Sequence, residues 1–324
     1  MTISQDPQLE ALKQGETHFI TEATTLNGSL KAFYEEYGYL VVPNALSSEE
    51  LKELNTEALS ICKGERGDFE GIEPSLAGDS NDDILRRYLC IHFPHKMSEI
   101  MLKYLSTPSM VEVLTEIIGP NVKCMQSMLF IKASGKPGQA WHQDEDFIPT
   151  RDRSLTGGWI AMDDATVENG CLWVIPGSHK HGVLWPLEAQ EDDRFDCTDE
   201  SQGFPYTDAD AIPVEVKAGS IVFFNGYLLH RSFPNRAKTG YRRVLVNHYM
   251  SASSLLPWKL PKDGEYMAIA DYRDVVMVAG KDPYFWKTTE DIAKPLVRPS
   301  GEGGCENWGS KNKKVIKQDE MAIG

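Results

Sequence analysis

The sequence predicts a mainly β fold of the jelly-roll kind, with helices placed before the strands. Two observations predict it. After Pro120, short strand-like runs are separated by turn residues such as Glu168-Asn-Gly170, a pattern typical of a sandwich or barrel. Before Pro120, apolar residues recur at helical spacing instead. The expected strands cover residues 123–132, 158–162, 171–175, 211–216, 220–224, 228–232 and 243–250.

The part of the chain before these strands is expected to support them with helices. Residues 28–43 are predicted to form a short helix that runs into an apolar strand. Ser47 and Glu50 have the spacing of a capping box, which opens a second helix. Residues 66–83 are rich in glycine, aspartate and serine and are predicted to be loop. Residues 96–118 are predicted to hold one or two more helices.

The chain is expected to form a single domain over residues 1–324, because no repeat of fixed period and no linker divides it. Its parts follow one another as a polar leader, a helical support, a strand core and a C-terminal extension. These parts cover residues 1–27, 28–119, 120–252 and 253–324.

Composition and charge exclude several classes of partner. The chain has 324 residues, is 41% hydrophobic and carries a formal charge of −15. Phosphate binding needs a basic surface, so this charge disfavours nucleic acid and anionic membranes. No apolar run reaches the roughly 18 residues that cross a bilayer. Six widely spaced cysteines without a CxxC pair indicate a reduced, cytoplasmic location. The expected partner is a small molecule, and no signal for an oligomeric state is present.

The stretch around His142 contains a candidate metal site. In an extended segment residues i and i+2 point to the same side, so His142 and Asp144 can face one ion while Gln143 faces away. A third ligand must come from elsewhere, and His230 stands at the end of a predicted strand. Two imidazoles and one carboxylate form the facial triad of non-haem iron(II) oxygenases, which leaves positions open for a co-substrate and dioxygen. The alternative is a surface turn that happens to contain a histidine.

A keto-acid co-substrate also needs a partner for its far carboxylate, and the planar fork of arginine suits that group. Arg242 follows His230 by 12 residues, in the next predicted strand. Ser232 shares a face with His230 and can donate a second hydrogen bond. Arg243 is the rival of Arg242, because alternation sends the two side chains to opposite faces and only one can reach the pocket.

Together these motifs form an ordered set that resembles the phytanoyl-CoA dioxygenase-like family of Fe(II)/2-oxoglutarate oxygenases. The resemblance covers about residues 28–252. Each motif alone occurs by chance in many proteins, whereas the ordered set is specific. The matching stretches are His142-Gln-Asp144, Trp159-Ile-Ala-Met-Asp-Asp164, Asn169-Gly-Cys-Leu172, Pro176-Gly-Ser-His179, His230-Arg-Ser232 and Gly240-Tyr-Arg242.

The resemblance implies a fold, an activity and a set of site residues. The fold would be a double-stranded β-helix core, cupin-like, with the N-terminal helices packed outside. Halogenating relatives lack the carboxylate ligand, so its presence here favours hydroxylation, with desaturation, cyclisation and epoxidation as alternatives. The cofactor would be Fe(II), with 2-oxoglutarate and O2 as co-substrates. The implied site residues are the catalytic ligands His142, Asp144 and His230 around the iron, Arg242 and Ser232 on 2-oxoglutarate, and Trp159, Gln126 and Met128 beside it.

The substrate is expected to be a small organic metabolite, oxidised at an unactivated C–H bond, rather than a CoA ester. Residues 188–210, here called the acidic segment, hold nine carboxylates against one basic residue, Arg194. If this segment covers the pocket, it repels a polyanionic CoA ester. The last residues, MAIG, match no peroxisomal address, which also departs from the enzyme that names the family.

Several neighbouring residues are expected to take no part in the chemistry. Glu145 and Asp146 fit solvated charges better than ligands. His179 is expected to fix a turn. The other histidines have no visible partner in the sequence and are assigned no role, namely His92, His95, His181 and His248.

Two other functions stay open for the same residues. A zinc- or manganese-dependent isomerase or hydrolase on the same scaffold would tolerate the three ligands, since affinity alone does not select iron. Arg242 disfavours it, because those chemistries need no clamp for a keto acid. A non-catalytic binding module that kept the fold is the other alternative, and the intact set of ligands disfavours it.

Overall fold

The computed structural model describes residues 28–196, 199–256, 273–287 and 289–300. The helices are α2 (Leu30–Tyr37), α3 (Ser48–Cys62), α4 (Asn81–Arg86), α5 (Glu99–Lys103), α6 (Pro108–Ile117) and α7 (Asp144–Phe147), with the short 3-10 helices η1 (Pro94–Lys96), η2 (Ser178–His181) and η3 (Asp208–Asp210). The strands are β1 (Tyr39–Val42), β2 (Tyr88–His92), β3 (Val122–Ala133), β4 (Gln139–His142), β5 (Thr156–Ala161), β6 (Leu172–Val174), β7 (Leu187–Ala189), β8 (Asp199–Ser201), β9 (Ile212–Val214), β10 (Ile221–Asn225), β11 (His230–Ser232), β12 (Tyr241–Ser251), β13 (Val276–Ala279) and β14 (Leu296–Pro299). The polar leader at 1–27 lies outside the described residues.

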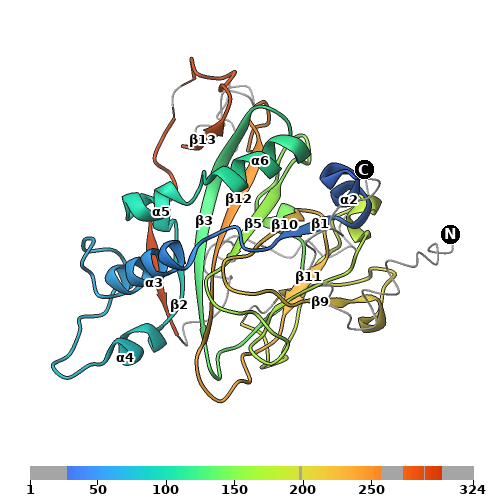
Figure 1. Cartoon of the computed structure of the whole chain (residues 1–324). Coiled ribbons are helices and arrows are strands. Elements are labelled where there is room, and N and C mark those ends of the chain that lie inside the picture. Colours follow the sequence, from blue (N-terminus) through green and yellow to red (C-terminus); the bar gives the residue numbers. More distant parts are fainter. Residues whose placement is uncertain (1–27, 197–198, 257–272, 288, 301–324) are drawn as a thin grey trace, which may run out of the picture.

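Most of the strands form two antiparallel sheets, which confirms the predicted mainly β, jelly-roll class. The larger sheet has the order β1-β10-β5-β12-β3-β2-β14, with β13 paired to β3 beside it. The smaller sheet has the order β4-β11-β6-β9. In Figure 1 the helices α3 and α5 lie on one side of the larger sheet, and β9 and β11 of the smaller sheet lie on the other. The interior between the two sheets is therefore the place for a site.

All seven predicted strands are present, and other parts of the chain add to the sheets. Strands β1 and β2 come from the part expected to be mainly helical, and β13 and β14 from the C-terminal extension; all four join the larger sheet. Strand β2 was not predicted because no glycine or proline separates it from the helix before it. Without such a turn signal a short apolar run is not set apart as a strand.

The helix ends follow from local capping. Helix α3 begins with the predicted capping box, in which Ser47 accepts from the Glu50 backbone and Glu50 accepts from the Ser47 backbone. The predicted loop at 66–83 is wrong at its end, where α4 begins. There Ser80 and Asp83 form a second capping box, with aspartate in place of the usual glutamate. Among the described residues, no helix is long and apolar enough to cross a bilayer.

Alternation along β12 decides which side chains face the helices and which face the interior. Asn247 donates to the backbone oxygen of Tyr104 at 3.2 Å, and Tyr249 donates to that of Leu105 at 2.8 Å. Odd-numbered residues of this strand therefore face the helical layer. On the neighbouring β5, a Cβ at Gly158 would lie 2.8 Å from the Met110 sulfur, so the helices pack directly on the backbone there. Even-numbered residues of β12 face the interior.

The outer face of the smaller sheet is covered by a second apolar cluster and by the acidic segment. Trp141 and Trp173 contribute to this cluster, together with Phe204 and Tyr206 from the acidic segment. Arg231 lies here with its guanidinium 4.4 Å from the Trp141 ring centroid, and it pairs with Asp208 at 3.0 Å. Glu200 accepts from the Trp141 backbone at 3.4 Å. The acidic segment is thus attached to the backs of β4 and β11.

Acid is expected to destabilise this fold partly through His95, which lies on the helical side of β3. His95 is 8% exposed, and its Nδ1 lies 2.5 Å from the Ser127 hydroxyl. Burial, reinforced by Lys96, lowers the pKa of His95 to about 4. Between pH 6.5 and 4 the unfolded chain therefore binds a proton that the folded chain does not. This stability is present above about pH 6.5 and is lost as the pH falls toward 4.

Between pH 7 and pH 4.5 the unfolding free energy of the wild type should fall by roughly 2–3 kcal/mol more than that of the His95→Gln variant. Glutamine keeps a polar group beside Ser127 but does not titrate. Urea unfolding at the two pH values measures the effect. His181→Gln serves as the control, because His181 is exposed and its Nε2 lies 2.8 Å from the Tyr206 hydroxyl. Equal pH dependence in His95→Gln and the wild type would contradict the prediction.

Candidate metal centre

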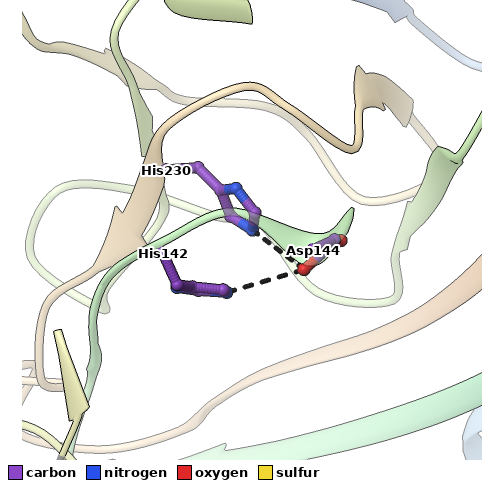
Figure 2. A group of neighbouring side chains, drawn as sticks. All are labelled: His142, Asp144 and His230. Atoms are coloured by element: carbon purple, nitrogen blue, oxygen red, sulfur yellow. Dashed lines mark ion pairs between the residues drawn. The ribbon is translucent and has the colours of Figure 1, made fainter. Parts of the chain in front are cut away.

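The structure brings His142, Asp144 and His230 together between the sheets. His142 ends β4, Asp144 opens α7, and His230 opens β11, directly opposite His142 in the strand register. One ligand atom of each residue lies within 4.8 Å of the others. The Asp144 Oδ1 atom is 3.7 Å from His142 Nε2 and 3.5 Å from His230 Nε2, as the dashed lines in Figure 2 show. The strand pairing of β4 with β11 is what places the two rings side by side.

Both imidazoles are oriented by their own backbone. His142 Nδ1 lies 2.7 Å from the Ala140 oxygen, and His230 Nδ1 lies 2.9 Å from the Leu228 oxygen. A ring that donates through Nδ1 carries its lone pair on Nε2, and both Nε2 atoms point toward Asp144 (Figure 2). Two nitrogens and one carboxylate oxygen thus face the same small volume.

The charge states of His142 and Asp144 suit a divalent cation, whereas His230 has to release a proton more readily than its surroundings favour. Burial alone would lower the pKa of His230, but Asp144 outweighs it and raises the pKa above the usual value. Burial, and then His230, lower the pKa of His142 to about 4, so its ring is neutral near pH 7. Burial alone would raise the pKa of Asp144, but His230 and His248 outweigh it and hold the pKa well below the usual value. Metal ions bind neutral imidazole and ionised carboxylate. The chemistry of this donor set therefore fits an iron(II) ion, and Zn²⁺ or Mn²⁺ would also find suitable ligands.

The turn after Asp144 is held by Glu145, and the expectation that Glu145 is solvated is wrong. The side chain is 1% exposed, and Oε1 accepts from the Thr150 backbone at 2.6 Å and from its hydroxyl at 2.5 Å. The Glu145 backbone donates to Gly226 at 3.0 Å. Burial raises the pKa of Glu145 to about 7. Asp146, by contrast, is exposed as expected. Glu145 therefore fixes the turn that carries Asp144.

A second polar group on the interior face of the larger sheet consists of two buried basic side chains. Arg242 is 4% exposed and Lys132 is 6% exposed, and they stand opposite each other on β12 and β3. Among the described residues, none accepts a hydrogen bond from Arg242, and its Nε is buried without a partner. Burial lowers the pKa of Arg242 to about 10. Burial, and then Arg242, hold the pKa of Lys132 well below its usual value.

Ser232 and Trp159 border this pair of cations. The Lys132 ammonium donates to the Ser232 hydroxyl at 2.9 Å and to the Phe233 backbone oxygen at 2.8 Å. The hydroxyl hydrogen of Ser232 is thereby directed away from Lys132. The guanidinium of Arg242 lies 5.7 Å from the centroid of the Trp159 ring. Arg243, the rival of Arg242, points to the other face and binds Asp163 at 2.8 and 2.6 Å, so it does not reach the pocket.

Gln126 and Met128 line the same interior face between the two polar groups. In the strand register Gln126 stands opposite His248, and Met128 stands opposite Val246, which in turn is opposite Trp159. The Gln126 amide lies 3.2 Å from the Met128 sulfur. Both residues are only partly buried, as is expected of residues that line a cavity.

Two residues of the interior were missed from the sequence, and alternation would have found both. His248 lies six residues after Arg242 on β12, and its Nε2 is 3.0 Å from Asp144 Oδ2. Lys132 lies four residues after Met128 on β3. An even spacing within one strand places side chains on the same face. His179 lies 3.1 Å from the Glu35 backbone oxygen and against Gly38, which agrees with the expected structural role.

The contacts of the acidic segment do not support a lid over the metal. Its residues Glu200 and Asp208 bind Trp141 and Arg231 on the outer face of the smaller sheet, whereas the metal ligands point inward. Asp196 reaches Arg298 on β14, at the edge of the larger sheet. The described residues of the acidic segment are therefore not placed to repel a CoA ester at the metal.

Two facing sheets with inward histidines and a carboxylate define a jelly-roll metalloenzyme. The family model of phytanoyl-CoA dioxygenase (PhyH) matches residues 34–244. Phytanoyl-CoA dioxygenase 1 of Oryza sativa subsp. japonica is 30% identical over 66% of this chain and 85% of its own length. The peroxisomal phytanoyl-CoA dioxygenase of Rattus norvegicus is 28% identical over 68% of each chain. The chain belongs to the phytanoyl-CoA dioxygenase family. It is thus a 2-oxoglutarate-dependent non-haem iron oxygenase, as predicted, and uses Fe(II), 2-oxoglutarate and O2.

Solved structures agree with this fold. The non-haem monooxygenase ThoJ superimposes with a TM-score of 0.59 at 19% identity, over 84% of this chain and 89% of that chain. EctD from S. alaskensis, solved with 2-oxoglutarate and 5-hydroxyectoine, gives a TM-score of 0.53 at 20% identity, over 72% of this chain and 80% of that chain. Identities this low support the shared architecture and nothing finer.

Proposed function

We propose that this enzyme hydroxylates an unactivated C–H bond of a small organic metabolite. His142, Asp144 and His230 would hold the iron, and Arg242, Ser232 and Lys132 would bind the far carboxylate of 2-oxoglutarate. The observation that carries the proposal is the pair of buried cations, Arg242 and Lys132, beside a cluster of metal ligands. A buried cation without an anionic partner is costly, so this pair is built for an anion that arrives from solution.

The protein contributes geometry rather than acid–base groups. Iron with 2-oxoglutarate and dioxygen supplies the oxidising chemistry. Arg242 and Lys132 would fix one end of the co-substrate, and the hydroxyl of Ser232, held by Lys132, would donate to the same carboxylate. Trp159 lies beside Arg242 and would help to keep water from that end of the pocket. Phe224, whose ring centroid is 4.8 Å from that of His230, forms an apolar wall beside the metal ligands.

Anaerobic addition of iron(II) and then 2-oxoglutarate tests the proposal. The weak visible metal-to-ligand charge-transfer band of an iron–keto acid complex is expected with the wild type and absent with glutarate, which lacks the keto group. Succinate release in air then screens candidate substrates. If no band forms while the protein binds Zn²⁺ or Mn²⁺ tightly, the assignment of these residues to iron and 2-oxoglutarate is wrong.

The preference for a free metabolite over a CoA ester is part of the proposal and is supported by the charge of −15 on the chain, which repels a polyanion at long range. Because curated relatives are named for phytanoyl-CoA, the direct comparison is phytanoyl-CoA against free phytanic acid. Succinate release that depends on phytanoyl-CoA, with a low KM, would overturn the preference.

A cytoplasmic location and a single domain over 1–324 stay predictions. The buried free cysteines Cys62, Cys90, Cys124 and Cys171 support a reduced compartment.

A further inference from the structure

We propose that His248 is a positioning residue that binds the second oxygen of Asp144, so that this carboxylate offers only one oxygen to the metal. The inference depends on the proposed iron site, and it assigns a role to a histidine that no motif singled out. It concerns how many positions around the ion stay open for the two co-substrates.

The two oxygens of Asp144 have different neighbours. Oδ1 faces the ligand histidines, at 3.7 Å from His142 Nε2 and 3.5 Å from His230 Nε2. Oδ2 points the other way and lies 3.0 Å from His248 Nε2. An N–H of His248 that donates to Oδ2 occupies that oxygen. Oδ1 is therefore the oxygen available to a metal ion, and Oδ2 is held by the protein.

The surroundings of His248 hold its ring in place. The side chain is 4% exposed, and the strand register puts Gln126 on one side of it and Gly157 on the other. A Cβ at Gly157 would lie 2.4 Å from the Phe224 ring, so no larger residue fits there. The ring of Phe224 in turn borders that of His230. His248 thus approaches Asp144 from the larger sheet, opposite the two ligand histidines on the smaller one.

One-oxygen binding by Asp144 matters because the reaction needs open positions on the ion. An octahedral ion held by three protein atoms keeps three open positions, two for a chelating keto acid and one for dioxygen. A carboxylate that binds through both oxygens would take one of these three. Hydrogen bonds to metal-bound carboxylates are a common means of fixing their orientation. His248 would keep Asp144 to one bond and so keep the dioxygen position open.

The test compares His248→Leu and His248→Gln with the wild type under anaerobic conditions. His248→Leu is expected to raise the iron(II) dissociation constant about 10- to 100-fold, as the loss of such outer contacts does. It should also weaken nitric oxide binding to the iron–2-oxoglutarate complex, read by electron paramagnetic resonance, because nitric oxide occupies the dioxygen position. His248→Gln keeps an N–H donor and should recover part of both properties.

His95→Gln is the matched control, because His95 is also buried and hydrogen-bonded but lies on the helical side of the sheet. Unchanged iron affinity and unchanged nitric oxide binding in folded His248→Leu would overturn the inference. Should His248→Leu fail to fold, His248→Ala takes its place, since it also removes the N–H donor to Asp144; wild-type values for both properties in His248→Ala would overturn the inference. A wild type without the charge-transfer band would instead refute the proposed function, so the two failures are distinguishable.

Discussion

The Asp144→Ala variant is expected to lose iron-dependent turnover by at least about a thousandfold. Removal of contacts around a ligand already costs 10- to 100-fold in metal affinity, and removal of a ligand costs more. Asp144 is also the only one of the three ligands that carries a negative charge, so its loss removes the charge that attracts the cation. Succinate release and an anaerobic iron(II) titration measure the two effects.

Asp146→Ala is the matched control for this variant. It removes a carboxylate two residues away from the same turn, but Asp146 is exposed and takes no part in the cluster of ligand atoms. Its iron affinity and turnover should stay within about twofold of the wild type. The assignment of Asp144 as a ligand would be wrong if both variants bound iron equally well.

The Arg242→Met and Lys132→Met variants are each expected to raise the KM for 2-oxoglutarate by roughly 100-fold, with iron affinity unchanged. Loss of one partner of a buried charged pair costs about 2–5 kcal/mol, and 100-fold corresponds to about 2.7 kcal/mol. The KM for 2-oxobutyrate, which lacks the far carboxylate, should change little. Preference for 2-oxoglutarate over 2-oxobutyrate should therefore collapse in both variants.

Arg243→Met provides the control, because Arg243 directly follows Arg242 on β12 but binds Asp163 on the opposite face. Thermal unfolding gives an independent check. Without co-substrate, Arg242→Met should be at least as stable as the wild type, since it removes a buried cation that has no anionic partner. With 2-oxoglutarate only the wild type should gain stability. A preserved gain in both Met variants would show that the far carboxylate binds elsewhere.

The strand core could be predicted from the sequence because turn residues, glycine above all, separate its strand-like runs. The three ligand residues followed from two local facts, the i, i+2 spacing of His142 and Asp144 and a histidine at a strand end. Strand β2 was missed because no glycine or proline precedes it to separate it from α4. Helix α4 was missed because its cap uses Asp83, in a stretch with the composition of a loop.

The residues that support the ligands were harder to predict because their roles depend on pairing between distant strands. Lys132 meets Ser232 across 100 residues, and His248 meets Asp144 across 104. Face alternation could have placed both in the interior, but not beside a given partner. Glu145 was misjudged because a charged residue next to a ligand resembles a surface turn. Only the fold shows that Thr150 and Gly226 bury it.

The two facing cations have a consequence for the lifetime of the protein. A ligand that binds only the folded chain stabilises it by an amount that grows with its concentration. Since 2-oxoglutarate is a central metabolite whose anion would neutralise Arg242 and Lys132, the folded fraction should rise and fall with the supply of that metabolite. Proteolysis removes chains in proportion to the unfolded fraction when opening is fast. The abundance of this enzyme would then follow the carbon status of the cell without any dedicated regulator.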